Sequence, residues 1–256
     1  MYRCGLLGKN INYSSSPEIH NNYYLNKKVP ISYELFDLSE ECIEHFINNL
    51  KKNNIIGFNV TIPYKQTIIK YLSQLEYPAD EIGAVNTVVV EEDKLVGYNT
   101  DYYGFISSIK DYNIVLNKRN AIILGAGGAA KSVSCALNDL GCSTIEIAAR
   151  NAEKAINDFN RRYKVVSIND YLDLSKYDII VNCTPVGNIN SINQIPINFD
   201  EINKSSIFYD LIYRPDKTRF LSKAEQLGAF IINGKMMLLH QAYKAADIWI
   251  SSLQLK

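Results

Sequence analysis

The sequence predicts an α/β protein made of two domains. Its 256 residues, 47% of them hydrophobic, suffice for one large or two modest cores. Short apolar runs typical of strands alternate with segments whose apolar residues have helical spacing, and the alternation restarts near Asn120. Because parallel strands need a crossover connection, usually a helix, this pattern favours mainly parallel sheets. We therefore expect a domain boundary between Tyr98 and Asn120.

Composition excludes several classes of protein. The chain carries 27 basic and 27 acidic side chains and has a pI near 6.8, which argues against binding nucleic acid or an anionic membrane, because both need a basic surplus. No apolar stretch approaches the ~18–20 residues of a membrane span, and the N-terminal residues lack a signal-peptide pattern, so we expect a cytoplasmic protein. The 5 cysteines lack C-x-x-C spacing and the 3 histidines lack cluster spacing, which predicts reduced thiols and no metal site.

In the first half, residues 2–8 form an apolar run closed by a glycine, which indicates a strand. Ser16-Pro17-Glu18 is typical of a helix start, with a cap serine, a proline at the first helical position and an acid in the first turn. A second helix is expected after Ser39, because apolar residues follow at helical spacing. Further strands are expected over residues 31–36, 55–60, 85–90 and 95–98, the last two joined by a polar turn at Glu92-Asp93 as an antiparallel element.

The second half repeats the alternation. A compact strand over residues 121–124 leads at once into a glycine-rich loop, and helical spacing follows as far as Gly141, a candidate C-cap. Later strands are expected over residues 144–149, 179–183, 207–209 and 230–232, and helices over residues 218–227 and 236–249.

The glycine-rich loop fits the pattern G-x-G-x-x-A and lies between a predicted strand and a predicted helix. In that context the pattern predicts a Rossmann-like dinucleotide-binding unit. The first glycine permits a tight turn, the second lets a pyrophosphate approach the backbone, and the helix N-terminus offers free N–H groups to phosphate. The alternative is a tight turn without a ligand. The cofactor-binding candidates in this loop are Gly125, Ala126, Gly127, Gly128 and Ala129.

The end of the next predicted strand bears on the choice of cofactor. NAD sites usually place an acid there to bind the ribose hydroxyls, whereas this chain has Ala148-Ala149-Arg150 and its nearest acid, Glu146, falls inside the strand. The planar guanidinium of an arginine pairs well with the oxygens of a 2′-phosphate, and Lys154 adds a second positive charge. These residues favour NADP. The alternative is that Arg150 is a solvated surface side chain.

Four polar patches follow predicted strands of the first domain, where open α/β sheets bind ligands. They span residues 14–17, 59–65, 86–87 and 99–101, and their hydroxyl, amide, ammonium and carboxylate groups suit a small polyhydroxylated ligand.

Lys65 and Asp101 are the pair with chemical interest in these patches. A lysine can move a proton at the oxygen of an alcohol or ketone while a nicotinamide moves hydride at the carbon, and a nearby carboxylate can orient it. A solvated lysine and a helix-capping aspartate are the alternatives. Gln241 lies beside the apolar stripe of the last helix and needs hydrogen-bond partners, which a ligand or a backbone group can supply.

In this order, the motifs resemble the shikimate dehydrogenase family over nearly the whole chain. The matching blocks are Gly5-Leu6-Leu7-Gly8 with Ser14-x-Ser16-Pro17, Gly57-Phe58-Asn59-Val60-Thr61-x-Pro63-x-Lys65, Gly83-Ala84-Val85-Asn86-Thr87, Gly97-x-Asn99-Thr100-Asp101-x-x-Gly104, the glycine loop, Asn182-Cys183-Thr184-Pro185-Val186-Gly187, Tyr209-Asp210-Leu211-Ile212-Tyr213-x-Pro215, and Asn233-Gly234-x-x-Met237-Leu238 with Gln241-Ala242.

The resemblance implies NADPH-dependent, reversible reduction of 3-dehydroshikimate to shikimate in aromatic amino-acid biosynthesis. It implies a discontinuous α/β substrate domain over residues 1–101 plus 236–256, with a mainly parallel sheet, and a Rossmann-like NADP-binding domain over residues 102–235. We expect a monomer or homodimer. Lys65 and Asp101 would be the catalytic pair and would also contact substrate. The other residues that the family pattern implies are Ser14 and Ser16 for the substrate carboxylate, Thr61, Asn86 and Gln241 for ring hydroxyls, Tyr213 where substrate meets nicotinamide, and Thr184 and Gly234 for the cofactor.

The chain departs from the family pattern at several positions. Proline and histidine are usual where Asn10 and Tyr13 stand, Asn-Arg-Thr where Ala149-Arg150-Asn151 stands, and methionine at Asn188. Three other interpretations stay open: a paralogue that also oxidises quinate, with NADP or NAD; a non-catalytic ligand sensor; and an enzyme similar to methylene-folate dehydrogenase, although the serine loop favours a carboxylate ligand.

Overall fold

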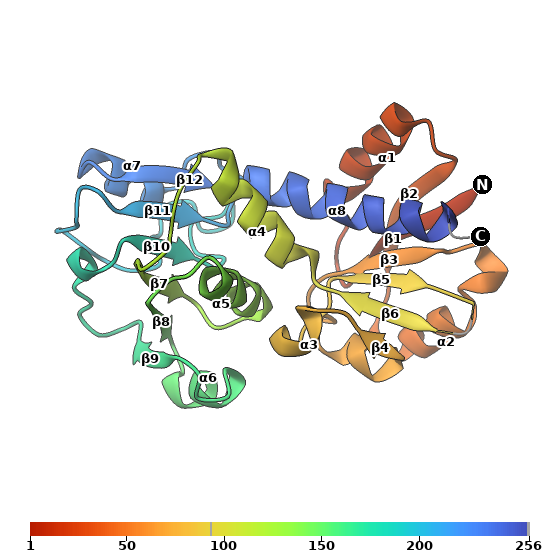
Figure 1. Ribbon diagram of the computed structural model, residues 1–256, viewed down its shortest axis with the longest axis horizontal. Helices are drawn as coiled ribbons and strands as arrows, with labels where there is room; N and C mark the ends of the chain where they lie inside the picture. Colours follow the sequence, from red (N-terminus) through yellow and green to blue (C-terminus); the bar gives the residue numbers. More distant parts are fainter. Residues whose placement is uncertain (93, 255–256) are drawn as a thin grey trace. The chain divides into compact units, whose positions relative to one another are not determined.

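The structure is a computed structural model that describes residues 1–92 and 94–254. The chain divides into two compact units (Figure 1). The first contains Met1–Gly104 and the segment that begins at Leu239, and the second is Phe105–Leu238. Each unit is built on its own six-stranded sheet, so the α/β prediction is confirmed.

The sheet of the first unit has the strand order β2-β1-β3-β5-β6-β4. Strand β1 (Tyr2–Gly8) pairs in parallel with β2 (Ile31–Asp37) and β3 (Gly57–Val60), and β4 (Gln74–Leu75) is parallel to β6 (Leu95–Tyr98). Strand β5 (Thr87–Val90) runs antiparallel to both β3 and β6, as the predicted late hairpin requires. In the turn of that hairpin, Asp93 lies outside the described residues.

Two apolar layers cover this sheet, because successive side chains of a strand point to opposite faces. On one face, Tyr24 of α1 (Ser16–Lys27) and Trp249 of α8 (Lys235–Gln254) pack with Cys4 and Leu6. On the other, Ile43 of α2 (Ile43–Asn48) packs with alternate strand residues such as Leu7. The shorter helical segments are η1 (Glu40–Cys42), η2 (Lys51–Asn53), η3 (Thr67–Tyr71) and α3 (Ala79–Ile82).

The sheet of the second unit is parallel in every pair, with the order β12-β11-β10-β7-β8-β9. In chain order this is the 3-2-1-4-5-6 arrangement of doubly wound dinucleotide-binding folds, which confirms the Rossmann-like prediction. The strands are β7 (Asn120–Leu124), β8 (Thr144–Ala149), β9 (Lys164–Ser167), β10 (Ile179–Asn182), β11 (Ile207–Asp210) and β12 (Phe230–Asn233).

Helices cover this parallel sheet as its buried strands require. Helix α5 (Gly128–Asp139) packs on β7 and β8, α6 (Ala152–Asp158) on β8 and β9, and α7 (Arg219–Gln226) on β11 and β12. The core between α7 and the sheet is rich in aromatic residues, with Phe199, Phe208 and Phe220 in mutual contact. A short helical segment, η4 (Leu174–Lys176), precedes β10.

Some predicted elements differ from those observed. The helix expected after Ser39 is three short pieces rather than one, and the strand expected from residue 55 starts at Gly57. Helix α4 (Thr100–Asp111) occupies the stretch interpreted as a boundary, and α6 and β9 were not anticipated. The polar residues 99–101 look like a turn in sequence because their side chains can satisfy backbone groups locally.

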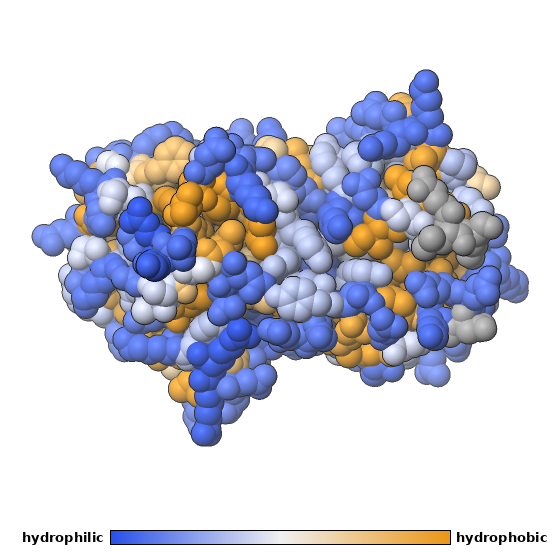
Figure 2. All heavy atoms as spheres, viewed as in Figure 1, coloured by the Kyte–Doolittle hydropathy of each residue, from blue (hydrophilic) through white to orange (hydrophobic). Residues whose placement is uncertain are grey.

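Figure 2 shows a largely hydrophilic surface on which apolar residues occur in scattered patches. Among the residues that the structure describes, no helix is both long and apolar enough to cross a membrane. Within the same residues, no cluster of three or more His, Cys, Asp or Glu side chains is placed to hold a metal ion.

Candidate active site

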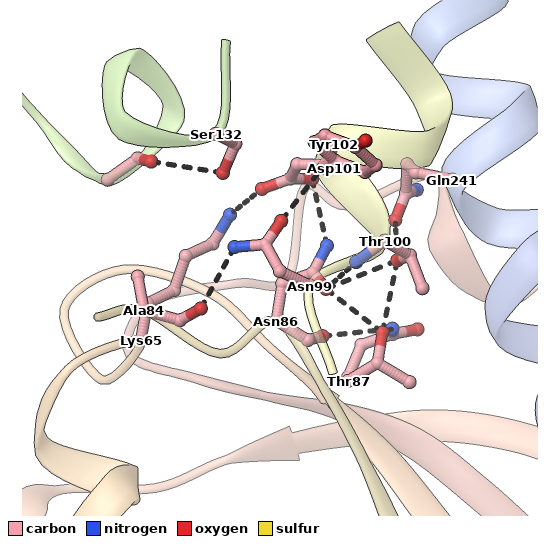
Figure 3. Close-up of polar contacts among 12 residues, drawn as sticks. Lys65, Ala84, Asn86, Thr87, Asn99, Thr100, Asp101, Tyr102, Ser132 and Gln241 are labelled. Carbon is pink, nitrogen blue, oxygen red and sulfur yellow. Dashed lines mark hydrogen bonds and ion pairs between the residues drawn. The ribbon is translucent and has the colours of Figure 1, made fainter. Parts of the chain in front are cut away.

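Lys65 and Asp101 form an ion pair in the first unit (Figure 3). Lys65 lies in the turn after β3, where its carbonyl accepts the Val85 N–H at 2.7 Å, and Asp101 lies in the first turn of α4, where a negative charge is favoured by the helix dipole. The ammonium Nζ donates to Asp101 Oδ2 at 2.5 Å. Their side chains are 19% and 13% exposed, so the pair is shielded from bulk water yet open to a ligand.

Asn86 holds the other oxygen of this carboxylate. The side-chain amide of Asn86 donates to Asp101 Oδ1 at 2.9 Å, and the side-chain oxygen Oδ1 of Asn86 accepts the Thr100 backbone N–H at 2.6 Å. The hydroxyls of Thr87 and Thr100 also reach that oxygen, at 3.1 and 3.2 Å. Because the side-chain oxygen of Asn86 already accepts three hydrogen bonds, Asn86 can bind a ligand through its second amide hydrogen.

A buried layer of polar side chains supports Asn86 from behind. The Asn59 side-chain amide donates to the backbone carbonyl of Asn86 at 3.0 Å and to the Thr87 hydroxyl at 2.9 Å. The Asn59 side-chain oxygen accepts from the Tyr33 phenol at 2.7 Å. Asn59 and Thr87 were seen in sequence only as members of motifs. Their position at the buried end of strands was the available signal, since a polar group there needs partners.

Gln241 belongs to the same constellation. It lies on α8, within the first unit, and its side-chain oxygen is 3.5 Å from the Thr100 hydroxyl (Figure 3). Thr100 is fully buried, whereas Gln241 is half-buried. The structure therefore brings Lys65, Asn86, Asp101 and Gln241 together through direct hydrogen bonds and the intermediary Thr100.

Ser14 and Ser16 form a second polar group at the start of α1. The Ser14 hydroxyl lies 3.1 Å from the Ser16 hydroxyl and accepts the Ser16 N–H at 3.2 Å. Both residues are half-buried at the positive end of a 12-residue helix, which suits a carboxylate. Thr61 follows β3, and its methyl group lies at the point where a Cβ on Gly8 would collide. The serine loop and the Thr61 turn thus begin from adjoining strands.

The glycine loop of the second unit adopts the conformation that its sequence predicts. Gly125 has a φ of +106°, in the region that favours glycine, and a Cβ there would lie 3.0 Å from the Thr184 side chain. Gly127 caps α5 in an extended conformation, and a Cβ on it would meet nothing within 4 Å. Beside the N–H groups of the first helical turn the loop therefore leaves open space, which fits a dinucleotide phosphate.

Arg150 and Lys154 stand beyond the end of β8, and both side chains are exposed. Asn151 caps α6 by accepting the Lys154 N–H at 2.9 Å, so its amide oxygen is committed to the helix. Glu146 accepts from Lys164 and from the Tyr177 phenol, which places the nearest acid of this strand in a structural role. Two cations, Arg150 and Lys154, are thus available for a cofactor phosphate at this strand end, and Glu153 in the first turn of α6 is an exposed acid between them.

The last three predicted residues follow other strands of the second unit. Thr184 comes after β10 and donates its hydroxyl to Asn182 at 2.7 Å, and Tyr213, half-buried, follows β11. Gly234 follows β12, where a Cβ would lie 2.0 Å from the Leu211 carbonyl oxygen. Close backbone packing therefore explains why position 234 is glycine, and its contact with a cofactor stays a prediction.

A parallel sheet of this order, with a glycine loop between its first strand and helix, defines the class of dinucleotide-binding α/β proteins. The sequence model of the shikimate dehydrogenase substrate binding domain matches residues 6–88. A shikimate dehydrogenase (NADP(+)) of Clostridium botulinum is 53% identical over 249 residues, which cover 97% of this chain and 96% of the relative.

Solved structures show the same likeness. A shikimate dehydrogenase crystallised with NADP+ is 34% identical, with a TM-score of 0.91 and coverage of 98% of this chain and 90% of that one. A Listeria monocytogenes shikimate 5-dehydrogenase in complex with shikimate and NAD is 30% identical, with a TM-score of 0.90 and coverage of 98% and 92%. The chain belongs to the shikimate dehydrogenase family, a family of oxidoreductases.

Proposed function

We propose that this protein is an NADP-dependent shikimate dehydrogenase, which catalyses the reversible, NADPH-dependent reduction of 3-dehydroshikimate to shikimate. The observation that carries the proposal is the 2.5 Å ion pair of Lys65 and Asp101, held by Asn86 and open to a ligand. Family membership supports the reaction type and its place in the shikimate pathway. The roles of individual residues are those that the family resemblance implies, taken together with the contacts described above.

In the proposed mechanism NADP, when bound, supplies hydride transfer at the ring carbon. Lys65 moves the accompanying proton at the ring oxygen: its ammonium donates to the carbonyl oxygen during reduction, and its amine accepts the hydroxyl proton during oxidation. Asp101 orients the Lys65 side chain through their ion pair, and its carboxylate accepts a hydrogen bond from a hydroxyl of the ring. The Asn86 amide keeps the Asp101 carboxylate from rotating.

The remaining polar groups bind and orient the substrate. Ser14 and Ser16, at the positive end of α1, bind the carboxylate. Thr61 and Gln241 bind ring hydroxyls, and Asn86 contributes its second amide hydrogen. Tyr213 serves at the nicotinamide side of the substrate. A set of hydroxyl, amide and ammonium donors around one carboxylate acceptor suits a small polyhydroxylated acid.

The second unit supplies the cofactor site in this proposal. The N–H groups of residues 125–129 bind the pyrophosphate, and Arg150 with Lys154 binds the 2′-phosphate. Thr184 and Gly234 lie on the nicotinamide side. We assign residues 1–101 with 236–256 to substrate binding and catalysis, and residues 102–235 to NADP binding. A cytoplasmic monomer or homodimer completes the proposal.

A paralogue with relaxed specificity is the second candidate. The observation in its favour is the strand end at Ala149-Arg150-Asn151, where Arg150 is the one member of the usual Asn-Arg-Thr present and the Asn151 oxygen caps α6. The Listeria relative crystallised with NAD shows that the fold accepts that cofactor. Such a paralogue would keep the Lys65–Asp101 chemistry and differ in substrate or cofactor preference.

The test is a matrix of initial rates of nicotinamide reduction by the purified protein, with shikimate or quinate crossed against NADP or NAD. Fastest turnover with shikimate and NADP is expected. Comparable rates with quinate or NAD would overturn the specificity and leave the chemistry. A folded protein that binds shikimate and turns over in no combination would overturn the proposal in favour of a ligand sensor.

A further inference from the structure

A buried hydrogen-bond network ties together three segments at the carboxyl edge of the second sheet. Its centre is Asp210, the last residue of β11, whose side chain is fully buried. Asp210 Oδ1 accepts the Asn182 amide and the Ile212 backbone N–H, each at 3.0 Å, and Oδ2 accepts the Thr218 hydroxyl at 2.7 Å. Every one of these donors is neutral.

Asn182 extends the network to the loop after β10. It is the register partner of Asp210 across the parallel pair of β10 and β11. Because its amide donates to Asp210, its carbonyl oxygen is turned toward Thr184, where it accepts the backbone N–H at 3.0 Å and the hydroxyl at 2.7 Å. The Thr184 hydroxyl in turn accepts the Val186 N–H at 3.2 Å. The Asn182 amide also donates to the Val186 backbone carbonyl at 3.4 Å, so Asp210 and the Thr184 loop together orient the Asn182 side chain.

The same carboxylate fixes the other two segments. Its bond to the Ile212 N–H shapes the turn that leads to Tyr213, and its bond to Thr218 holds the residue that caps α7 through the Leu221 N–H. Gly187, at the end of the Thr184 loop, has a φ of +105°. A Cβ built on it would lie 3.6 Å from the Thr218 side chain and 3.7 Å from the Ile212 side chain, so this loop approaches both residues closely. Thus one buried side chain connects the loops of Thr184 and Tyr213.

The buried carboxylate of Asp210 carries a cost in stability. Burial raises the pKa of Asp210 to about 6, against the three hydrogen bonds that lower it, so holding an ionised carboxylate here opposes folding. An apolar side chain would avoid burying a charge, but it would leave the Asn182 amide, the Ile212 N–H and the Thr218 hydroxyl without their acceptor. What an apolar side chain cannot do is orient Asn182 and the Ile212 N–H at the same time.

We propose that Asp210 is a positioning residue for the nicotinamide side of the cofactor site, acting through Asn182 on the Thr184 loop and through Ile212 on the Tyr213 turn. This inference rests on the proposed function, since it requires those loops to contact NADP. Asp210 itself touches neither substrate nor cofactor. Its loss should therefore weaken NADP binding more than shikimate binding.

Two mild variants test the proposal in the full-length protein. In Asp210→Asn the new amide faces Thr218, whose hydroxyl already accepts from Leu221 and loses its own acceptor. In Thr218→Val the hydroxyl is removed at nearly constant volume, and Thr218→Ser restores it. The matched control is Ser108→Ala, which breaks a buried 2.8 Å hydrogen bond to Tyr209, the neighbour of Asp210 on β11, and leaves the network intact.

The readout is the KM for NADP and for shikimate, with thermal unfolding measured for each variant. We expect Asp210→Asn and Thr218→Val to raise the KM for NADP about tenfold, because misplaced Thr184 and Tyr213 loops would lose on the order of one hydrogen bond to the charged cofactor. The KM for shikimate should change less than about twofold, Thr218→Ser should resemble the wild type, and Ser108→Ala should keep the wild-type KM for NADP despite a lower Tm.

An unchanged KM for NADP in Thr218→Val, or an equal rise in Ser108→Ala, would overturn the positioning role. If Asp210→Asn does not fold, the comparison of Thr218→Val with Thr218→Ser still tests the positioning role of Asp210. Failure of the proposed function looks different, because the wild type itself would then show no NADP-dependent turnover of shikimate.

Discussion

The two ligand regions of this protein are built by opposite means. In the first unit, the candidate active site is made of side chains, and Lys65, Asn86 and Asp101 are locked by hydrogen bonds of 2.5–2.9 Å. In the second, the glycine loop is made by leaving side chains out, and a Cβ on Gly127 would meet nothing within 4 Å. Substitutions should therefore damage the first region by removing groups and the second by adding atoms.

The difference also separates what is needed for folding from what is needed for binding. Asn86 and Thr100 are buried and hydrogen-bonded, so they support both the fold and the proposed site. Within the glycine loop the two roles fall on different residues: Gly125 has the φ of +106° that the fold requires, whereas Gly127 has an ordinary extended backbone.

The largest expected effect is that of Asp101→Asn on turnover. The side-chain oxygen of the new asparagine still accepts from the Asn86 amide, but its NH2 group faces the Lys65 ammonium, which is also a donor. The lysine therefore loses the negative charge that orients it. We expect kcat/KM for shikimate to fall by about 10²–10³, within the range of general acid–base contributions. Asp247→Asn, which alters an exposed aspartate bonded to Tyr23 in the same unit, is the control and should retain wild-type kcat/KM. Equal activity in Asp101→Asn and the wild type would refute the role of the pair.

The glycine loop should show the reverse behaviour. Gly127→Ala adds a methyl group to the space left for phosphate, so the Kd for NADP should rise by about tenfold or more, the cost of one lost hydrogen bond to a charged group. Its Tm should be unchanged, because the new Cβ has no protein atom to collide with. The paired variant Gly125→Ala should lower the free energy of unfolding by about 1–2 kcal/mol, since alanine is strained at positive φ. A lower Tm in Gly127→Ala together with a wild-type Kd would contradict this account of the loop.

A smaller effect is expected for Arg150→Ala on cofactor choice. The Arg150 side chain is exposed, so its pairing with a 2′-phosphate is partly screened by water. We expect the ratio of kcat/KM for NADP to that for NAD to fall about tenfold, the lower end of the value of a charge-assisted hydrogen bond. Lys164→Ala, an exposed cation on the neighbouring strand β9 that pairs with Glu146, provides the control. An unchanged ratio in Arg150→Ala would assign the phosphate to other residues.

A separate prediction concerns acid stability in the core of the first unit. Burial lowers the pKa of His20 from 6.5 to about 3, and this outweighs the nearby Asn59 side chain, which raises it. A depressed pKa means that His20 contributes stability above pH 6.5, and this contribution is lost as the pH falls toward 3. The loss should reach about 3 kcal/mol by pH 4.

Trp249, the single tryptophan of the chain, is fully buried beside His20 and reports on this unit by its fluorescence. Urea unfolding at pH 7 and pH 4 should show a smaller loss of stability in His20→Phe than in the wild type. The raised pKa of Asp210 acts in the opposite direction in the second unit, favouring folding as the pH falls through about 6. An identical pH dependence of Trp249 fluorescence in both proteins would contradict the buried neutral state of His20.

Local patterns in the sequence predicted most of the fold, because strand alternation and the glycine loop depend on neighbouring residues. Pro17 marked the start of α1, although the cap is Ser15, without a side-chain cap hydrogen bond, rather than the expected Ser16; the pattern at residues 125–130 marked the turn into α5. Helix α4 was missed, because the polar residues that precede it satisfy backbone groups as turn residues do. Its apolar spacing begins only at Phe105.

Most contacts between distant segments could not be predicted. One example is the hydrogen bond between Asn59 and Asn86, and another is the register that places Asn182 opposite Asp210. Both depend on which strands pair, and the sequence alone does not determine this. Chemistry suggested Lys65 and Asp101 as a pair, and the structure shows that they touch. It does not follow from the sequence that Asn86 would hold the carboxylate, because asparagine is also a common turn residue.

The most direct test of the central claim is the turnover of Lys65→Ala, measured together with its Kd for shikimate by calorimetry. The account predicts that kcat falls by about 10³ or more while the Kd changes less than about fivefold, because the proton-transfer group is lost and the other polar contacts remain. Turnover within tenfold of the wild type would show that Lys65 does not move the proton, and would contradict the proposed mechanism.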